Sequence, residues 1–118
     1  MEYLKEKGYR LHILSNGFKE VTDRKCELSG IKPYFETITS ADEINIRKPH
    51  PEVYEFALKK SAASPEESAM IGDDWIADVE GALNFKFAKV VFFDVFNDNF
   101  EADGVDVIKK LNEVKNIF

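Results

Sequence analysis

The sequence has little of what stabilises secreted proteins or anchors membrane proteins. Its one cysteine, Cys26, excludes an internal disulfide, and its place among periodic apolar residues favours a small buried hydrophobe. No apolar run approaches the roughly 18 residues of a membrane span. The N-terminal segment MEYLKEKGYR has no apolar stretch after its charges, so it does not resemble a signal peptide. We therefore expect a cytoplasmic protein that has no membrane partner.

An excess of basic residues is also lacking. The chain has 16 lysines and arginines against 22 acidic residues, which gives a net charge of -6. Proteins that bind nucleic acid normally need a basic face to replace counterions on phosphates, so no nucleic-acid partner is expected. Hydrophobic residues make up 44% of the chain and charged residues 32%, a balance typical of globular proteins. With no repeat or linker, residues 1–118 are expected to form a single domain.

Helix-like and strand-like segments alternate along the chain. The strand-like runs cover residues 9–14, 35–39, 68–71, 90–93 and 105–108, and the helix-like runs cover 1–7, 19–29, a stretch from Pro51, 78–85 and 109–114. Gly8 and Gly30 follow the first two helix-like runs, where a left-handed residue is often needed. Strands separated by helices predict βαβ units and a parallel sheet. We therefore expect an α/β, Rossmann-like three-layer sandwich, whose ligands bind beyond the carboxyl ends of the strands.

The first candidate group, Ser15-Asn16-Gly17, directly follows the first strand-like run. At a strand-to-helix turn, these residues can offer a side-chain O–H and exposed backbone N–H groups to one anion. The positive end of the following helix adds to this preference. The alternative is a plain turn with an N-cap, since Asn-Gly is a common turn pair.

Lys48 is the second candidate. It lies in the segment RKPHP, residues 47–51, whose two prolines stiffen the backbone just after the lysine. A rigid mount lets a cation meet a phosphate or a carboxylate at a fixed distance. The alternative is an exposed lysine ahead of a helix, and the neighbouring Arg47 is expected to be solvated.

The third candidate is an acidic group that follows the run 68–71. The segment GDDWIAD, residues 72–78, places Asp73, Asp74 and Asp78 close together, and their charges repel one another unless a cation lies among them. Mg2+ takes carboxylate oxygens together with water and substrate phosphate. Gly72 allows a sharp turn that would point Asp73 out of the sheet. The alternative is helix capping, above all for Asp78.

The order of these groups is more specific than any one of them. A receiver domain of a response regulator has similar groups, but its acidic cluster comes first and its lysine last, so the order excludes it. The chain resembles the haloacid dehalogenase (HAD) superfamily from its second motif onward. The segments LSNG at 14–17, RKPHP at 47–51 and GDDWIAD at 72–78 resemble the second, third and fourth motifs of that superfamily.

The resemblance implies a role for each phosphate-binding residue. In the family, the hydroxyl residue of the second motif binds the transferring phosphoryl group, and the corresponding residue here is Ser15. Asn16 and Gly17 are expected to contact the phosphate beside it. The lysine of the third motif steadies the charge of the nucleophile and the phosphate, a role that falls to Lys48. Ser15 and Lys48 are thus the expected catalytic residues of this chain.

The resemblance also implies a cofactor and a reaction. The fourth motif holds Mg2+, here through Asp73 together with Asp74 or Asp78. The reaction is the magnesium-dependent hydrolysis of a small phosphate monoester. The segments IGDDW and VFF are similar in sequence to those of the pyrimidine-nucleotidase branch, which adds nucleotides to the expected substrates.

The family's first motif, an Asp-x-Asp pair, does not end any strand-like run of this sequence. In the family, its first aspartate attacks phosphorus and its second acts as acid and base. We expect the chain to begin after the strand that carries this motif and after the cap insertion, as a partial core with no cap domain. The chain alone should therefore bind Mg2+ and phosphate weakly and turn over essentially nothing.

The absence of this strand has a consequence for the sheet. In the family it lies between the strands that correspond to 9–14 and 68–71. Those two strands are expected to pair directly, to expose their edges, or to accept a strand from another chain, as in a homo-oligomer. Lys86 stands where the family usually has a glycine. If the left-handed backbone geometry is kept, the lysine should cost ~1 kcal/mol of stability.

Two functional hypotheses follow. In the first, the chain is a truncated form of a magnesium-dependent phosphatase. In the second, it is a non-catalytic module that binds phosphate, a metal or a protein partner with the same scaffold. Whether the chain is itself an enzyme depends on whether it has a nucleophile, which the missing first motif would supply.

Overall fold

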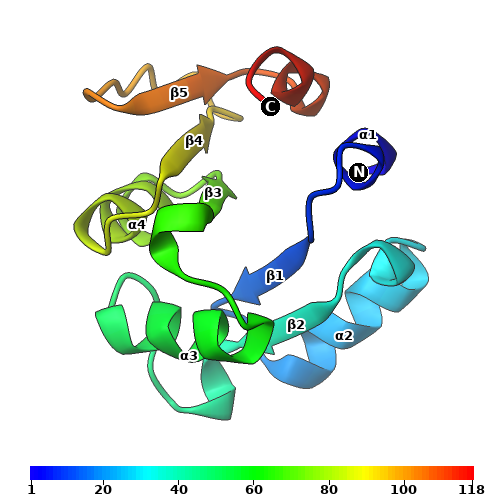
Figure 1. Cartoon of the computed structure of the whole chain (residues 1–118). Helices are drawn as coiled ribbons and strands as arrows, with labels where there is room; N and C mark the ends of the chain where they lie inside the picture. The colour runs from blue at the N-terminus through cyan, green and yellow to red at the C-terminus, as the bar shows by residue number, and fades with distance from the viewer.

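Five parallel strands form the framework of the protein (Figure 1). The computed structural model describes residues 1–118, and its strands are β1 (His12–Ser15), β2 (Thr37–Ser40), β3 (Ala69–Gly72), β4 (Lys89–Phe93) and β5 (Val105–Ile108). β1 pairs with β2, whereas β3, β4 and β5 pair in that order. All pairs are parallel, as predicted, but they form two sheets rather than the single sheet that the sequence predicted.

Helical segments connect consecutive strands, except between β4 and β5. The α-helices are α1 (Glu2–Glu6), α2 (Lys19–Leu28), α3 (Pro51–Ser61) and α4 (Gly81–Asn84). The 3₁₀ segments are Lys32–Tyr34, Ala41–Glu43, Pro65–Glu67 and Leu111–Asn116, and a π-helical turn, Trp75–Glu80, leads into α4. Both α2 and α3 contact β2, which gives a layered, Rossmann-like α/β arrangement. None of the helices is both long and apolar enough to cross a membrane.

Left-handed residues lie where the sequence predicted them. Gly8 has a φ of +89° after α1, and Gly30 has a φ of +74° after α2, which confirms both as helix stops. Lys86 has a φ of 64°, so a non-glycine residue adopts this geometry at a cost of about 1 kcal/mol. The last predicted helix, 109–114, is instead the 3₁₀ segment Leu111–Asn116.

The facing edges of β1 and β3 are not hydrogen-bonded to each other. Of the arrangements expected for these two strands, direct pairing is therefore excluded. Side-chain exposure agrees with this: Ile71 in β3 is 36% exposed, whereas Val91 in β4, which has a neighbour on each side, is fully buried. Because the strands of a parallel sheet are normally covered and flanked, β1 and β3 each keep an edge that could accept another strand.

Helix α3 joins the two sheets through a buried tyrosine. Leu14 of β1 and Met70 of β3 both pack against the apolar cluster that contains Tyr54. The Tyr54 hydroxyl donates a hydrogen bond to the carbonyl of Ala77, in the π-helical turn after β3. Gly81 lies against this hydroxyl, and a Cβ there would overlap it. Apolar packing around Tyr54 and this buried hydrogen bond thus connect the two halves of the protein.

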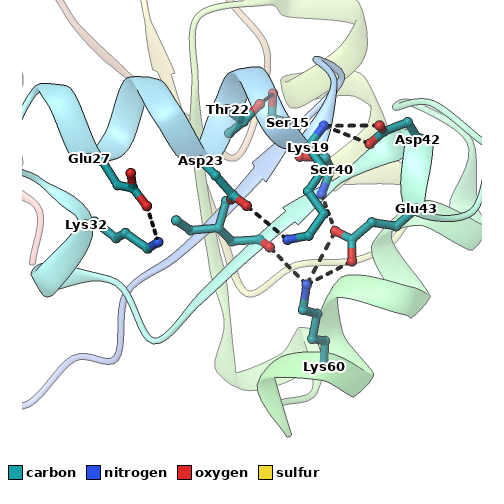
Figure 2. Close-up of polar contacts among 11 residues, drawn as sticks. Ser15, Lys19, Thr22, Asp23, Glu27, Lys32, Ser40, Asp42, Glu43 and Lys60 are labelled. Carbon is teal, nitrogen blue, oxygen red and sulfur yellow. Dashed lines mark hydrogen bonds and ion pairs between the residues drawn. The ribbon is translucent and has the colours of Figure 1, made fainter.

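A polar network fixes the turn that leaves β2 (Figure 2). The Glu43 carboxylate accepts hydrogen bonds from the Ser40 N–H (2.7 Å) and from the Lys60 ammonium (3.1 Å). Lys60 also donates to the carbonyl of Ile38 (2.9 Å). Burial raises the pKa of Glu43, but these hydrogen bonds outweigh burial and bring the pKa below its usual value of 4.5. The network holds the start of the segment that leads to Lys48.

We expect Tyr54→Phe to lower the free energy of unfolding by about 1–2 kcal/mol, because the buried carbonyl of Ala77 would lose a donor. Urea unfolding followed by circular dichroism measures this change. Tyr9→Phe is the matched control, since the Tyr9 side chain is 44% exposed. Equal stability of Tyr54→Phe and the unmodified chain would contradict a structural role for the hydroxyl.

The lowered pKa of Glu43 predicts a pH dependence of stability. A carboxyl that is more acidic in the folded protein contributes stability above its usual pKa of 4.5, and this contribution is lost as the pH falls through the folded value. Glu43→Gln should therefore make the urea midpoint less sensitive to pH between neutrality and the acid range. Glu66→Gln, which removes an exposed carboxylate, should leave the profile unchanged. If the urea midpoint of Glu43→Gln depends on pH as that of the unmodified chain does, Glu43 does not contribute to the pH dependence of stability.

Candidate phosphate and metal site

Lys48 lies between the ends of the two sheets. Its ammonium donates to the carbonyl of Leu14 (3.1 Å), at the end of β1, and to Asp78 Oδ1 (2.5 Å). The Lys48 side chain is 11% exposed and that of Asp78 is 6% exposed, so the pair is shielded from water and Lys48 is not an exposed surface lysine. An ammonium has three donors, and these contacts leave one N–H for another acceptor. The neighbouring Arg47 is exposed, as expected.

Asn16 holds the backbone of Lys48. Its amide donates through Nδ2 to the Lys48 carbonyl (3.2 Å) and accepts through Oδ1 from the Lys48 N–H (2.7 Å). The peptide bond that follows, Lys48–Pro49, is cis. The Asn16 Oδ1 and one Nδ2–H are thus engaged with Lys48, which leaves the second Nδ2–H and the backbone N–H for the phosphate contact predicted for this residue.

The Ser15 hydroxyl accepts two hydrogen bonds at the end of β1. The donors are the Gly17 N–H (2.9 Å) and the Thr22 hydroxyl (3.2 Å), and Figure 2 shows Thr22 of α2 beside Ser15. A hydroxyl has one donor and two acceptor positions, so these contacts leave its hydrogen to be donated elsewhere. Gly17 is closely packed, since a Cβ there would lie 3.2 Å from both hydroxyl oxygens. The segment is thus a tight turn that also presents a hydroxyl donor.

The carboxylate of Asp78 is held on both sides. Oδ1 meets Lys48, and Oδ2 accepts the Asp74 N–H (3.1 Å). Asp78 is buried and lies against Gly72, where a Cβ would overlap its carboxylate. Glycine at position 72 is therefore required by this close approach. Asp78 is not the helix cap of the alternative interpretation but the counter-ion of Lys48.

Asp74 and Asp73 have different surroundings. Asp74 caps the π-helical turn, because its Oδ1 accepts the Ala77 N–H (2.9 Å). With this cap the helix begins at Trp75, before the predicted start at residue 78. Asp73 is exposed, and its carboxylate has no hydrogen bond or ion pair within the chain. No group of three or more His, Cys, Asp or Glu side chains is assembled into a metal site.

The three aspartates differ in how well they suit Mg2+. This ion is commonly bound through one or two carboxylates, with water and substrate phosphate completing its coordination. Asp73 offers both of its oxygens and Asp74 offers Oδ2, whereas both oxygens of Asp78 already accept hydrogen bonds. The donor set therefore fits Mg2+ best at Asp73. The metal role of all three stays a prediction.

Two residues that shape the site were not singled out by any motif. Thr22 lies on α2 outside the three motifs, and nothing in the sequence around it distinguishes it from other helix residues. Asp42 accepts the Lys19 N–H at the start of α2 through both carboxylate oxygens (3.0 and 3.1 Å), although it lies 23 residues further along the chain. Both contacts join separate segments, so no local pattern in the sequence predicts them.

Sequence comparisons place the chain among haloacid dehalogenase-like hydrolases. Residues 1–86 match the family model of the haloacid dehalogenase-like hydrolases. The chain is 32% identical over 120 residues to the glyceraldehyde 3-phosphate phosphatase of Methanothermobacter thermautotrophicus, a match that covers 97% of this chain and 53% of that protein. It is 32% identical over 75 residues to the pyrophosphatase PpaX of Bacillus pumilus, covering 64% of this chain and 35% of PpaX. The chain thus spans about half or less of the length of these relatives.

Solved structures show the same arrangement of elements. A HAD phosphatase from Thermococcus onnurineus matches with a TM-score of 0.87 at 29% identity, covering 98% of this chain and 53% of that one. A dehalogenase matches with a TM-score of 0.90 at 28% identity, covering 99% and 52%. The magnesium-bound HAD-hydrolase YfnB of Bacillus subtilis, at 22% identity and a TM-score of 0.85, shares the fold. The chain has a truncated α/β Rossmann-like fold and belongs to the haloacid dehalogenase-like hydrolase family.

Proposed function

We propose that the chain supplies the phosphate- and magnesium-holding part of a phosphohydrolase that acts on a small phosphate monoester. The observation that carries this proposal is a pair of free donors at the end of β1, the Ser15 O–H and the third N–H of Lys48. A hydroxyl and an ammonium on rigid mounts suit phosphoryl oxygens. The names of the phosphatase and pyrophosphatase relatives support a small phosphorylated substrate.

Each residue of the site has its own task in this proposal. Ser15 donates its hydroxyl hydrogen to a phosphoryl oxygen, and Lys48 places a positive charge beside that oxygen. Asp78 and Asn16 hold Lys48 in position through its ammonium and its backbone. Asp73 binds Mg2+, which when bound offsets the negative charge of the phosphate.

We assign no nucleophile to this chain. It has no Asp-x-Asp pair, so its residues provide no carboxylate for a phosphoaspartate. We infer that the chain alone binds phosphate and Mg2+ without turnover. In the complete enzyme, the nucleophile would come from the portion of the relatives that this chain does not span. The unpaired edges of β1 and β3 are where the strand that carries it would add.

Calorimetric titration with inorganic phosphate in the presence of Mg2+ tests the phosphate site. Lys48→Met and Ser15→Ala should each weaken binding by about tenfold, since each removes a hydrogen bond to a charged group. Arg47→Met is the matched control, because it removes an exposed positive charge from the adjacent residue. Lys48→Met leaves the buried carboxylate of Asp78 unpaired, so Ser15→Ala provides the test if that variant unfolds.

Phosphate binding that is unchanged in Ser15→Ala, or equally weakened in Arg47→Met, would overturn the site. Turnover of a chromogenic phosphate ester by the chain, lost in Asp73→Asn, would contradict the inferred inactivity.

Titrations with glyceraldehyde 3-phosphate and with a pyrimidine nucleoside monophosphate compare two substrate classes. The first is suggested by a relative and the second by the pyrimidine-nucleotidase resemblance.

Thr22→Val should weaken phosphate binding by about threefold, less than Ser15→Ala. Valine keeps the shape of threonine but removes the O–H, so Ser15 loses one of the two hydrogen bonds that orient its own hydrogen. Thr39→Val is the control, because the Thr39 hydroxyl is buried without a hydrogen-bond partner. The same titration, with a thermal melt to confirm folding, measures both variants. An affinity of Thr22→Val equal to that of the unmodified chain would exclude this role.

A further inference from the structure

A second buried carboxylate lies outside this site, at the end of β4. The Asp94 side chain is fully buried and accepts hydrogen bonds from the Asp98 N–H (2.8 Å), the Asn99 N–H (3.1 Å) and the ammonium of Lys109. The hydrogen bond from Lys109 lowers the pKa of Asp94, so the carboxylate is charged at neutral pH. Lys109 directly follows β5. The loop after β4 is therefore tied by its backbone to both strands.

The anchored loop brings Phe100 against the acidic segment. The centroid of the Phe100 ring lies 5.3 Å from that of Trp75 and 6.4 Å from that of Phe92. Trp75 also packs edge-on against Phe92, at 5.0 Å. Because Trp75 directly follows Asp73 and Asp74, these rings connect the loop after β4 with the two carboxylates that are most open to a metal ion.

Apolar burial alone does not account for the position of this loop. Val95 is 48% exposed and Phe96 is 75% exposed, so the loop turns two of its apolar side chains towards solvent. Its backbone, in contrast, is bound to a buried charge. A buried carboxylate is strongly unfavourable unless it is paired and hydrogen-bonded. The contacts of Asp94 therefore specify where the loop lies, and with it Phe100.

We propose that Asp94, Lys109 and Phe100 are positioning residues, which hold the acidic segment 73–75 through Trp75 in an arrangement suited to a divalent cation. Adjacent carboxylates repel each other, and although Asp74 caps the π-helical turn, the Asp73 carboxylate has no hydrogen bond or ion pair to hold it. The aromatic contact provides an attraction that does not depend on the charge of the segment. The consequence for the cation rests on the proposed function, whereas the holding of the segment does not. A site whose ligands are held in advance binds its ion more tightly.

The fluorescence of Trp75 tests the holding of the segment, because it is the only tryptophan of the chain. Acrylamide is uncharged, so it measures the accessibility of the indole without interference from the acidic surroundings. Lys109→Met and Phe100→Ala should raise the acrylamide quenching constant by about twofold, as expected for a segment released from its contacts. Lys109→Arg, which keeps the charge, should stay close to the unmodified chain. Lys110→Met and Phe96→Ala are matched controls from adjacent or exposed positions in the same region.

Calorimetric titration of the same variants with Mg2+ alone tests the consequence for the cation. The affinity should fall by about tenfold in Lys109→Met and Phe100→Ala, as for other residues that orient metal ligands, and should be unchanged in the two controls. Circular dichroism confirms that each variant is folded. If Lys109→Met unfolds, Phe100→Ala carries the test, since it leaves the ion pair intact.

The outcomes separate this inference from the proposed function. Quenching constants in Lys109→Met and Phe100→Ala that match the unmodified chain overturn the inference. A raised quenching constant with an unchanged Mg2+ affinity overturns it too, because the contact would then not position the metal ligands. If the unmodified chain binds no Mg2+, the metal function proposed for Asp73 has failed, and the quenching results alone decide whether the segment is held by Phe100.

Discussion

The structure depends on one buried ion pair, between Lys48 and Asp78. Lys48 belongs to the segment before α3, Asp78 to the turn after β3, and the same ammonium reaches the carbonyl of Leu14 at the end of β1. Since β1 and β3 are not hydrogen-bonded to each other, this cation and the packing around Tyr54 keep the ends of the two sheets together. Removing one partner of a buried pair typically costs about 3–5 kcal/mol, a large part of the roughly 5–15 kcal/mol that stabilises a small protein.

The same ion pair explains why three aspartates of one short segment differ. Asp78 is buried, so its charge requires Lys48 and the backbone N–H of Asp74. Asp74 uses one oxygen to cap a helical turn. Asp73 is exposed and retains both oxygens. The mutual repulsion of the segment is thus relieved at two of its three carboxylates by contacts within the chain, which leaves Asp73 as the carboxylate with most capacity for an external cation.

Much of the apolar surface of this chain is left uncovered. Only 18 of its 118 residues are buried, and large side chains such as Ile71, Ile76 and Phe96 are exposed. The two inner strand edges are unpaired as well. These features agree with a chain that spans about half the length of the phosphatase it matches along nearly its whole sequence. A strand placed between β1 and β3 would satisfy both edges and cover apolar surface.

The sequence by itself determined the alternation of strands and helices, their parallel direction and the segments that contribute to the candidate site. These depend on short-range patterns, such as the apolar run that ends at Ser15, the prolines that follow Lys48, and the glycine before Asp73. Only the tertiary structure decided which partner each side chain has. The contacts of Lys48 with Asn16 and with Asp78 join residues 32 and 30 positions apart, and such contacts depend on how the elements pack. For the same reason the sequence predicted one sheet where the chain forms two, because strand pairing is a property of neighbours in space.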